Sequence, residues 1–171
     1  FDGQDEAGYK EDSKTSPLNV YGQTKAKGEE LLQKNCEMFY LIRTSWLYGK
    51  ALQIGKPRGL NFVQTMLKLA QEKDEIQVVN DQFGKPTYTA DLALKIREIL
   101  DEMKPCGIYH VTNDEVCSWY DFAKKIFELK DVMVKLMPVT SNRCPVKTRV
   151  KASRPKYGIL INNKLKPLRK W

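Results

Sequence analysis

Segments with helical periodicity alternate with short apolar runs along this chain, and this alternation constrains its fold more than any other feature. The residues from Leu18 to about Asn35 are predicted to form a helix, and the continuous apolar run at 37–43 is typical of a buried strand. Further strands are predicted at 76–79, 107–111 and from Val132 to about Met137, with helices between them. Strands that alternate with helices of this length predict an α/β fold with parallel strand pairing.

The predicted helices begin at residues that cap helices well. Asn19 is the expected N-cap of the first helix, Asn61 of the second and Thr89 of the third. Ser118, with Asp121 three residues later, resembles a capping box at the start of the fourth helix. We therefore expect the helices to start at or beside these residues.

Length and composition exclude several classes of protein. A chain of 171 residues is long enough for one full domain, and its 42% hydrophobic content is ordinary for a globular protein. The longest uncharged apolar runs are only a few residues, and the first residues show no signal-peptide pattern. No membrane span is predicted, and the cytoplasm is the expected location.

The cysteines form no metal-binding or disulfide pattern. Cys36, Cys106, Cys117 and Cys144 lie far apart, with no Cys-x-x-Cys pair, and His110 is the only histidine. Zinc binding and a disulfide framework are therefore not expected. His110 ends an apolar strand and is predicted to be a structural histidine rather than a base.

Basic residues are concentrated at the end of the chain. Eleven of the 29 Lys and Arg residues lie at 134–171, a segment that contains none of the 21 acidic residues. Basic clusters permit an anion site or nucleic-acid binding, although a solvated surface is the favoured interpretation for most of these side chains. The residues considered for phosphate contacts are Arg143, Lys147, Arg149, Lys151 and Arg154.

Tyr21 and Lys25 are the strongest catalytic candidates in the sequence. A spacing of four on a helix places them on one face a turn apart. A nearby positive charge favours a phenolate and lowers the pKa of a phenol toward working pH, which suits a proton donor in oxidoreduction at a carbonyl. Gly22 and Gly28 have no side chains, so they are expected to leave two positions of the helix face open to the close approach of another molecule. The alternative is an aromatic residue that simply lies beside a solvated lysine.

Several strings of residues occur in the order found in a known family. They lie at 1–3, 20–29, 41–49, 61–63, 81–93, 107–110 with 118–119, and 154–155. With these strings the chain resembles, over nearly its whole length, the C-terminal part of the dTDP-4-dehydrorhamnose reductases, which are extended short-chain dehydrogenases/reductases.

The resemblance implies reduction of the 4-keto group of dTDP-6-deoxy-L-lyxo-4-hexulose by NADPH or NADH, which forms dTDP-L-rhamnose. Tyr21 would supply the proton to the developing alkoxide. Lys25 would lower the pKa of that phenol and bind the nicotinamide ribose. Thr44 and Ser45 match the segment that passes the nicotinamide in the family, so both are predicted to contact the cofactor.

The resemblance also implies a set of substrate contacts. Trp46 matches the tryptophan of the sugar pocket, with burial in the core as the alternative. Gln82, Pro86 and Thr87 lie in the loop expected beside the substrate, and Arg154 is the candidate for the diphosphate. Asp91 is expected at the start of a helix, where its carboxylate interacts favourably with the positive end of the helix dipole, and no catalytic role is predicted for it.

The family also implies a fold and an assembly. We expect the C-terminal part of a Rossmann-like NAD(P)-binding fold with a smaller α/β substrate-binding domain. Residues 1–50 would complete the nucleotide-binding domain and residues 51–171 would form mainly the substrate domain, with the strand at 107–111 returning to the nucleotide-binding sheet. Some relatives use Mg²⁺ at a subunit interface, so Mg²⁺ and a homodimer are further candidates, although no residue is assigned as a metal ligand.

One departure from the family concerns the cofactor. The chain has no Gly-x-x-Gly-x-x-Gly loop, whose glycines let the backbone approach the cofactor pyrophosphate. It also begins at Phe1 rather than Met, so it is expected to be the later part of a longer protein and inactive alone.

Other functions remain open on the sequence. A nucleotide-sugar epimerase or dehydratase would share Tyr21 and Lys25, but Trp46 stands where the epimerases typically have Asn. A non-catalytic regulatory homologue would act through protein contacts. A nucleic-acid-binding module rests on the basic tail alone and is not predicted.

Overall fold

The computed structural model describes residues 1–51, 59–143 and 152–171. Within these ranges, no helix has the length and apolar character needed to cross a membrane. The predicted α/β class is confirmed, because the four helices of the described residues accompany strands that pair mostly in parallel.

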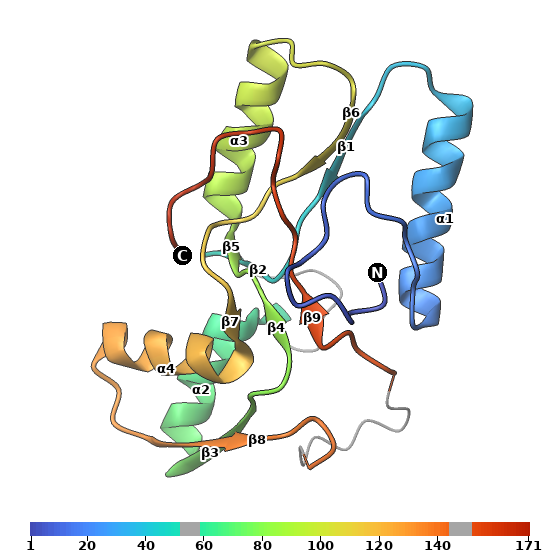
Figure 1. Ribbon diagram of the computed structural model, residues 1–171. Coiled ribbons are helices and arrows are strands. Elements are labelled where there is room, and N and C mark those ends of the chain that lie inside the picture. The colour runs from blue at the N-terminus through green and yellow to red at the C-terminus, as the bar shows by residue number, and fades with distance from the viewer. Residues whose placement is uncertain (52–58, 144–151) are drawn as a thin grey trace.

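One half of the molecule is built on a pair of parallel strands. β1 (Tyr40–Arg43) pairs with β6 (Gly107–His110), and the two strands lie between α1 (Val20–Asn35) and α3 (Thr89–Asp101) in Figure 1. α3 packs on this pair through a small apolar core. The core consists of Ile99, Tyr109, Val111 and Leu165, with Tyr40, Ile42, Leu92 and Leu168 packed against it.

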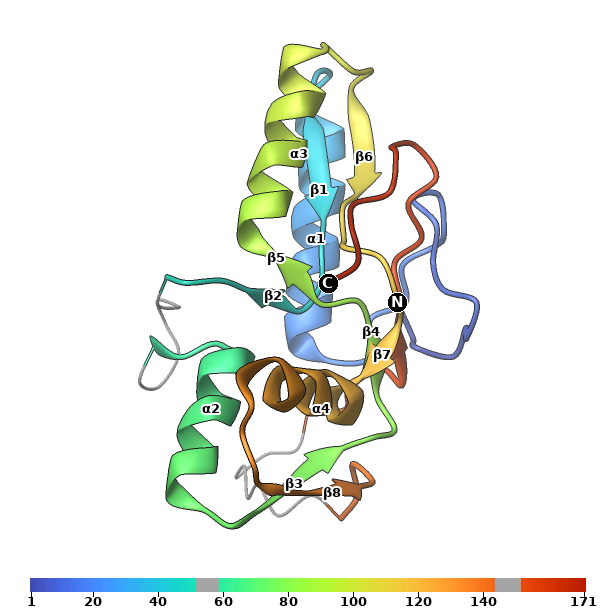
Figure 2. The same ribbon diagram turned by 90° about the vertical axis from the view of Figure 1, so that its left-hand side faces the viewer.

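The other half has a larger core between two helices and a second strand pair. β3 (Glu75–Val79) pairs in parallel with β8 (Lys135–Val139) and lies against α2 (Phe62–Glu72) and α4 (Trp119–Lys130), as Figure 2 shows. The buried residues of this core are Met66, Ile76, Val78, Cys117, Phe122, Ala123, Ile126 and Phe127.

Short strands connect the two halves. β2 (Leu47–Tyr48) pairs in parallel with β5 (Thr87–Tyr88). β4 (Phe83–Gly84) lies between β7 (Cys117–Ser118) and β9 (Tyr157–Gly158), antiparallel to the first and parallel to the second. The division of the chain into domains at 1–50 and 51–171 remains a prediction.

Three of the four predicted helix caps are confirmed. The Asn19 side chain accepts a hydrogen bond from the backbone of Gly22, and Asn61 and Ser118 each form a capping box. The prediction for Thr89 is wrong, because Thr89 is the first residue of α3 and the N-cap is Tyr88, whose side chain makes no cap bond. β5 therefore runs directly into α3 with no room for a separate cap.

The last predicted strand begins later than expected. α4 continues to Lys130, and Asp131 follows as a left-handed C-cap with a φ of 51°. The next residues form the turn, so β8 begins at Lys135 rather than Val132. Met133, which the apolar pattern assigned to a strand, is consequently 95% exposed.

Candidate active site

Tyr21 and Lys25 lie together on an open face of α1. The helix starts where the Asn19 side chain accepts the Gly22 N–H at 2.8 Å, and none of its residues is buried. Tyr21 is 71% exposed, and Nζ of Lys25 lies 5.7 Å from the centroid of its ring. Outside the backbone of α1 itself, no atom of the described residues lies within 4 Å of a Cβ added at Gly28, so the helix face is open there. The prediction that Gly22 also keeps this face bare is wrong, because a Cβ added at Gly22 would lie 2.9 Å from Cβ of Pro17.

The segment after β1 carries the predicted cofactor contacts. The Ser45 hydroxyl donates to the carbonyl oxygen of Lys85 at 2.8 Å, which ties this segment to the loop before β5. The Thr44 hydroxyl is shielded from solvent and has no hydrogen-bond partner in the described part of the chain. A buried polar atom without a partner is unfavourable, so a polar group brought by a ligand would stabilise Thr44.

Trp46 is held in an uncommon conformation by tight packing. Its φ of 47° lies in the left-handed region, which non-glycine residues seldom adopt. Its ring stacks on Trp119 with centroids 3.6 Å apart, and a Cβ added at Gly84 would lie 2.6 Å from its Cε2 atom. Trp46 is only half-buried, so packing accounts for its position without excluding a substrate contact.

The other predicted substrate residues make contacts within the protein. Thr87 is fully buried, pairs with Leu47 across the short sheet, and donates its backbone N–H to Trp46 at 3.2 Å. Gln82 donates its side-chain amide to the Ser141 hydroxyl at 2.8 Å. The structure thus brings Ser45, Trp46 and Thr87 together, and holds Gln82 against the turn after β8.

Arg154 is exposed and follows a residue that is hydrogen-bonded to the N-cap of α1. The Asn19 side chain donates to the carbonyl oxygen of Ser153 at 2.7 Å, so the segment carrying Arg154 lies at the start of α1. Arg143 is also exposed. Three other basic residues considered for phosphate contacts lie outside the described ranges: Lys147, Arg149 and Lys151.

Part of the basic tail is neutralised by ion pairs. Nε of Arg169 lies 2.8 Å from the Asp91 carboxylate, and Lys170 pairs with Glu115 at 2.6 Å. Burial alone would raise the pKa of Asp91, but hydrogen bonds from Arg169 and Asn113 outweigh it and lower the pKa. Asp91 therefore fastens the C-terminal segment to α3.

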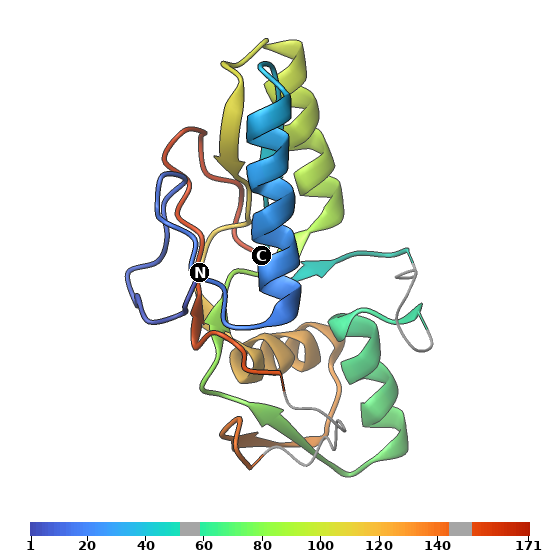
Figure 3. The same ribbon diagram turned by 90° about the vertical axis from the view of Figure 1, so that its right-hand side faces the viewer.

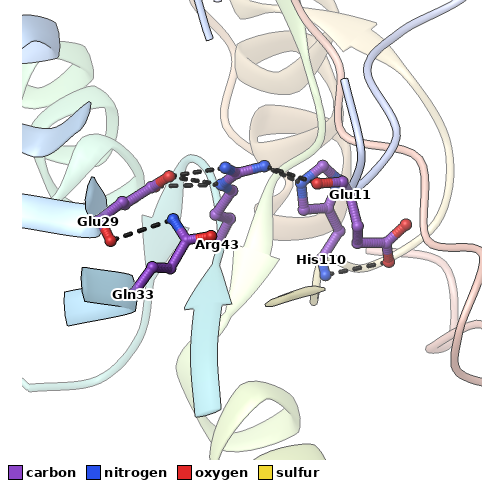
Figure 4. A network of polar contacts seen from close by, with 5 residues as sticks. All are labelled: Glu11, Glu29, Gln33, Arg43 and His110. Carbon is purple, nitrogen blue, oxygen red and sulfur yellow. Dashed lines mark hydrogen bonds and ion pairs between the residues drawn. The ribbon is translucent and has the colours of Figure 1, made fainter. Parts of the chain in front are cut away.

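A partly buried polar network beside the open helix was not predicted. Figure 4 shows Arg43 between Glu29 of α1 on one side and His110 and Glu11 on the other. The guanidinium holds the Glu29 carboxylate with two nitrogens, Nη2 at 2.6 Å and Nε at 3.1 Å. Its Nη1 atom lies 3.2 Å from both the Glu11 carbonyl oxygen and Nε2 of His110.

The geometry fixes the protonation state of His110. Nδ1 lies 3.0 Å from the carbonyl oxygen of Ile161, which can only accept, so Nδ1 carries the proton. Nε2 then presents its lone pair to Arg43. Burial lowers the pKa of His110, Glu11 partly opposes that shift and Arg43 adds to it. His110 is fully buried as a neutral ring, which agrees with its predicted structural role.

Comparison with known proteins places the chain in a family. Residues 1–170 match the family described as the RmlD substrate binding domain. The chain belongs to this family. Its relatives include the spore coat polysaccharide biosynthesis protein SpsK of Bacillus subtilis, 42% identical over 94% of the chain and 52% of the relative. The dTDP-4-dehydrorhamnose reductase of Escherichia coli is 42% identical over 75% of the chain and 42% of the relative.

A solved structure shares the fold of this RmlD domain. The crystal structure of dTDP-4-dehydrorhamnose reductase from Bacillus anthracis in complex with NADP matches with a TM-score of 0.89 at 38% identity. The match covers 100% of the chain and 58% of that structure. The chain thus spans about half the length of the curated relatives it matches.

Acidic, histidine and cysteine side chains do not cluster in the described part of this RmlD domain. No group of three or more His, Cys, Asp or Glu side chains there could hold a metal ion. Cys36 and Cys106 are exposed free thiols, and Cys117 is a buried one. Burial raises the pKa of the Cys117 thiol far above its ordinary value, so that thiol is unreactive.

The neutral state of His110 predicts how stability depends on pH. Because the folded-state pKa lies below the ordinary value of about 6.5, only the unfolded chain takes up a proton as the pH falls through that value. We expect the free energy of unfolding to fall as the pH is lowered from about 7 through about 6.5. Denaturant unfolding across this range measures it. A flat profile would contradict the neutral ring, since the sequence has no other histidine.

Proposed function

We propose that this chain forms the proton-donating and substrate-binding part of an NADPH-dependent dTDP-4-dehydrorhamnose reductase. The observation that carries the proposal is the open pair Tyr21 and Lys25 within a fold that matches an NADP-bound reductase along the whole chain. An epimerase or dehydratase is less well supported. Two of the relatives named above carry an enzyme name, at 42% and 38% identity, and both are reductases.

The proposed reaction adds a hydride and a proton across the 4-keto group of a dTDP-linked 6-deoxy sugar. NADPH, when bound, supplies the hydride that reduces the carbonyl carbon. The Tyr21 hydroxyl donates its proton to the oxygen that becomes an alkoxide, and the new hydroxyl completes the product. Tyr21 is left as a phenolate, which the ammonium group of Lys25 stabilises until solvent returns the proton.

Features of the chain fit a nicotinamide cofactor beside α1. Tyr21 and Lys25 are exposed on that helix, and the Thr44 hydroxyl has no hydrogen-bond partner among the described residues. Thr44 and Ser45 would contact the nicotinamide side of the cofactor, and Lys25 its ribose. The pyrophosphate would need a glycine-rich loop, which these 171 residues do not contain.

The substrate would extend from Tyr21 toward Arg154. Trp46 would form one wall of the sugar pocket, with Gln82, Pro86 and Thr87 in the neighbouring loop. Because Thr87 is fully buried, we propose that it acts through the shape of this loop rather than through its hydroxyl. Arg154 is an exposed guanidinium near the start of α1 and would bind the diphosphate of the nucleotide.

The remaining features of the proposed enzyme are less specific. We propose a dTDP-sugar as its small-molecule partner, no nucleic acid, and a cytoplasmic location. A homodimer and the use of Mg²⁺ stay predictions. The molar mass of the assembly in solution would test the first, and the activity left after chelation with EDTA would test the second.

A coupled pair of measurements tests the proposed function. In the longer enzyme, oxidation of NADPH should depend on dTDP-6-deoxy-L-lyxo-4-hexulose and yield dTDP-L-rhamnose. The 171-residue chain alone should neither turn over nor bind NADPH with micromolar affinity in calorimetry, because it lacks the pyrophosphate loop. Micromolar binding to the chain alone would contradict the division of the cofactor site, and no oxidation in the longer enzyme would contradict the function itself.

A further inference from the structure

The helix that carries Tyr21 and Lys25 has little apolar packing to hold it. None of its residues is buried, and Val20 and Leu31 are exposed. Figure 3 shows α1 running along one side of the molecule. In the described part of the chain, the side chain of Glu29 makes the polar contact that joins the body of α1 to the rest of the protein, through Arg43.

This contact is well shielded and has two-point geometry. The side chains of Arg43 and Glu29 are only 11% and 21% exposed, so water screens their attraction less than it screens a surface pair. Two nitrogens of the planar Arg43 guanidinium donate to the Glu29 carboxylate, which fixes the relative orientation of the two groups as well as their distance. Such a contact resists rotation of the helix about its axis.

The far side of Arg43 is equally fixed. Its Nη1 atom lies against His110 of β6 and the Glu11 carbonyl oxygen. The Glu11 carboxylate accepts the backbone N–H of His110 at 3.2 Å and that of Asn163 at 3.3 Å. The network therefore joins α1 to both strands of the parallel pair and to the segments near each end of the chain.

The position of the network connects it to the proposed chemistry. Tyr21, Lys25 and Glu29 follow one another at intervals of four, so Glu29 lies one turn beyond Lys25 on the same side of α1. Arg43 directly precedes Thr44 in the chain. One ion pair thus sets the rotation of the helix that carries the proton donor relative to the segment proposed to contact the nicotinamide.

We propose that Glu29, Arg43 and His110 are positioning residues that fix the rotation of α1 and so aim Tyr21 and Lys25 at the reacting carbonyl. The inference rests on the proposed function. In this proposal, none of the three touches the substrate. They act through the helix, and since small displacements of a catalytic group lower the rate strongly, their loss affects turnover more than binding.

The test compares two Glu→Gln substitutions on the same helix in the longer enzyme. Glu29→Gln removes the charge that faces Arg43. Glu30→Gln removes an equal charge from an exposed ion pair with Lys27 at 2.8 Å, a contact made within α1 itself. We expect Glu29→Gln to lower kcat about tenfold or more with the substrate KM changed less than about twofold. Glu30→Gln should leave both within about twofold.

The pH profile and the melting temperature separate positioning from simple loss of stability. For Glu29→Gln we expect the pH dependence of kcat to shift, because Lys25 and Tyr21 are placed differently relative to the substrate. We expect Glu29→Asp, which restores the charge, to recover part of the rate. A kcat equal to that of Glu30→Gln would overturn the proposal. So would a loss of activity that disappears on cooling below the unfolding transition, with an unchanged pH profile.

A label on Tyr21 decides the proposal without turnover. With 3-fluorotyrosine at position 21, the ¹⁹F resonance should move or broaden in Glu29→Gln and stay in place in Glu30→Gln. An identical resonance in both variants would overturn the positioning role. Absence of any reductase activity in the unsubstituted enzyme would instead overturn the proposed function, while the label would still report on the helix.

Discussion

Replacing Tyr21 with phenylalanine is expected to lower the turnover of the reductase by about a hundredfold or more, the range found for a positioned proton donor. The substitution removes one hydroxyl from a side chain that is 71% exposed and donates no hydrogen bond within the described residues, so folding should be unaffected. Steady-state oxidation of NADPH measures the effect. The loss should appear in kcat and kcat/KM alike, because the proton is transferred only in the transition state.

A second tyrosine provides the matched control. Tyr120 lies on α4, is half-buried beside the larger core, and belongs to none of the proposed contacts. Tyr120→Phe removes the same hydroxyl from a helix and should keep turnover within about twofold. Equal activities of the two variants would remove Tyr21 from the mechanism. A hundredfold loss in Tyr21→Phe alone, with the melting temperature unchanged, would assign it the proton.

Features encoded by short-range patterns were predictable from the sequence. The spacing of Tyr21 and Lys25 needs only one turn of helix, and the caps at Asn19, Asn61 and Ser118 need only the three residues that follow each of them. Thr89 has the right chemistry for a cap but is displaced by the pairing of β5 with β2, a contact that local pattern cannot reveal.

Long-range contacts were not predictable. The network around Arg43 joins Glu29, fourteen positions before it, to His110, sixty-seven positions after it, and no periodicity relates these residues. A signal did exist, because an arginine that ends an apolar strand needs a partner for its charge. The left-handed backbone conformation of Trp46 was not predictable either. It depends on stacking with Trp119 and on the absence of a side chain at Gly84.

Gly3→Ala is expected to destabilise the protein by about 3 kcal/mol or more, through a clash that no side-chain movement can relieve. Gly3 is buried with a φ of 72°, where an alanine is strained by about 1 kcal/mol. The added Cβ would collide with Cβ of Pro155 and lie 2.5 Å from its Cα and 2.8 Å from the backbone nitrogen of Lys156. Two segments of backbone must then separate, which also breaks the hydrogen bond from Tyr157 to the Gly3 carbonyl oxygen.

Gly28→Ala is the matched control, because it makes the same change where, outside the backbone of α1, no described atom lies within 4 Å. Gly28 is inside α1, where alanine is favoured over glycine by about 0.5 to 1 kcal/mol, so this variant should be slightly more stable. Denaturant unfolding of both variants gives the two free energies. Since Arg154 precedes Pro155, Gly3→Ala should also weaken binding of the dTDP-sugar at temperatures where the variant is folded. Equal stabilities of the two variants would show that the backbones of 1–3 and 154–156 are not in contact, and would separate Arg154 from the start of α1.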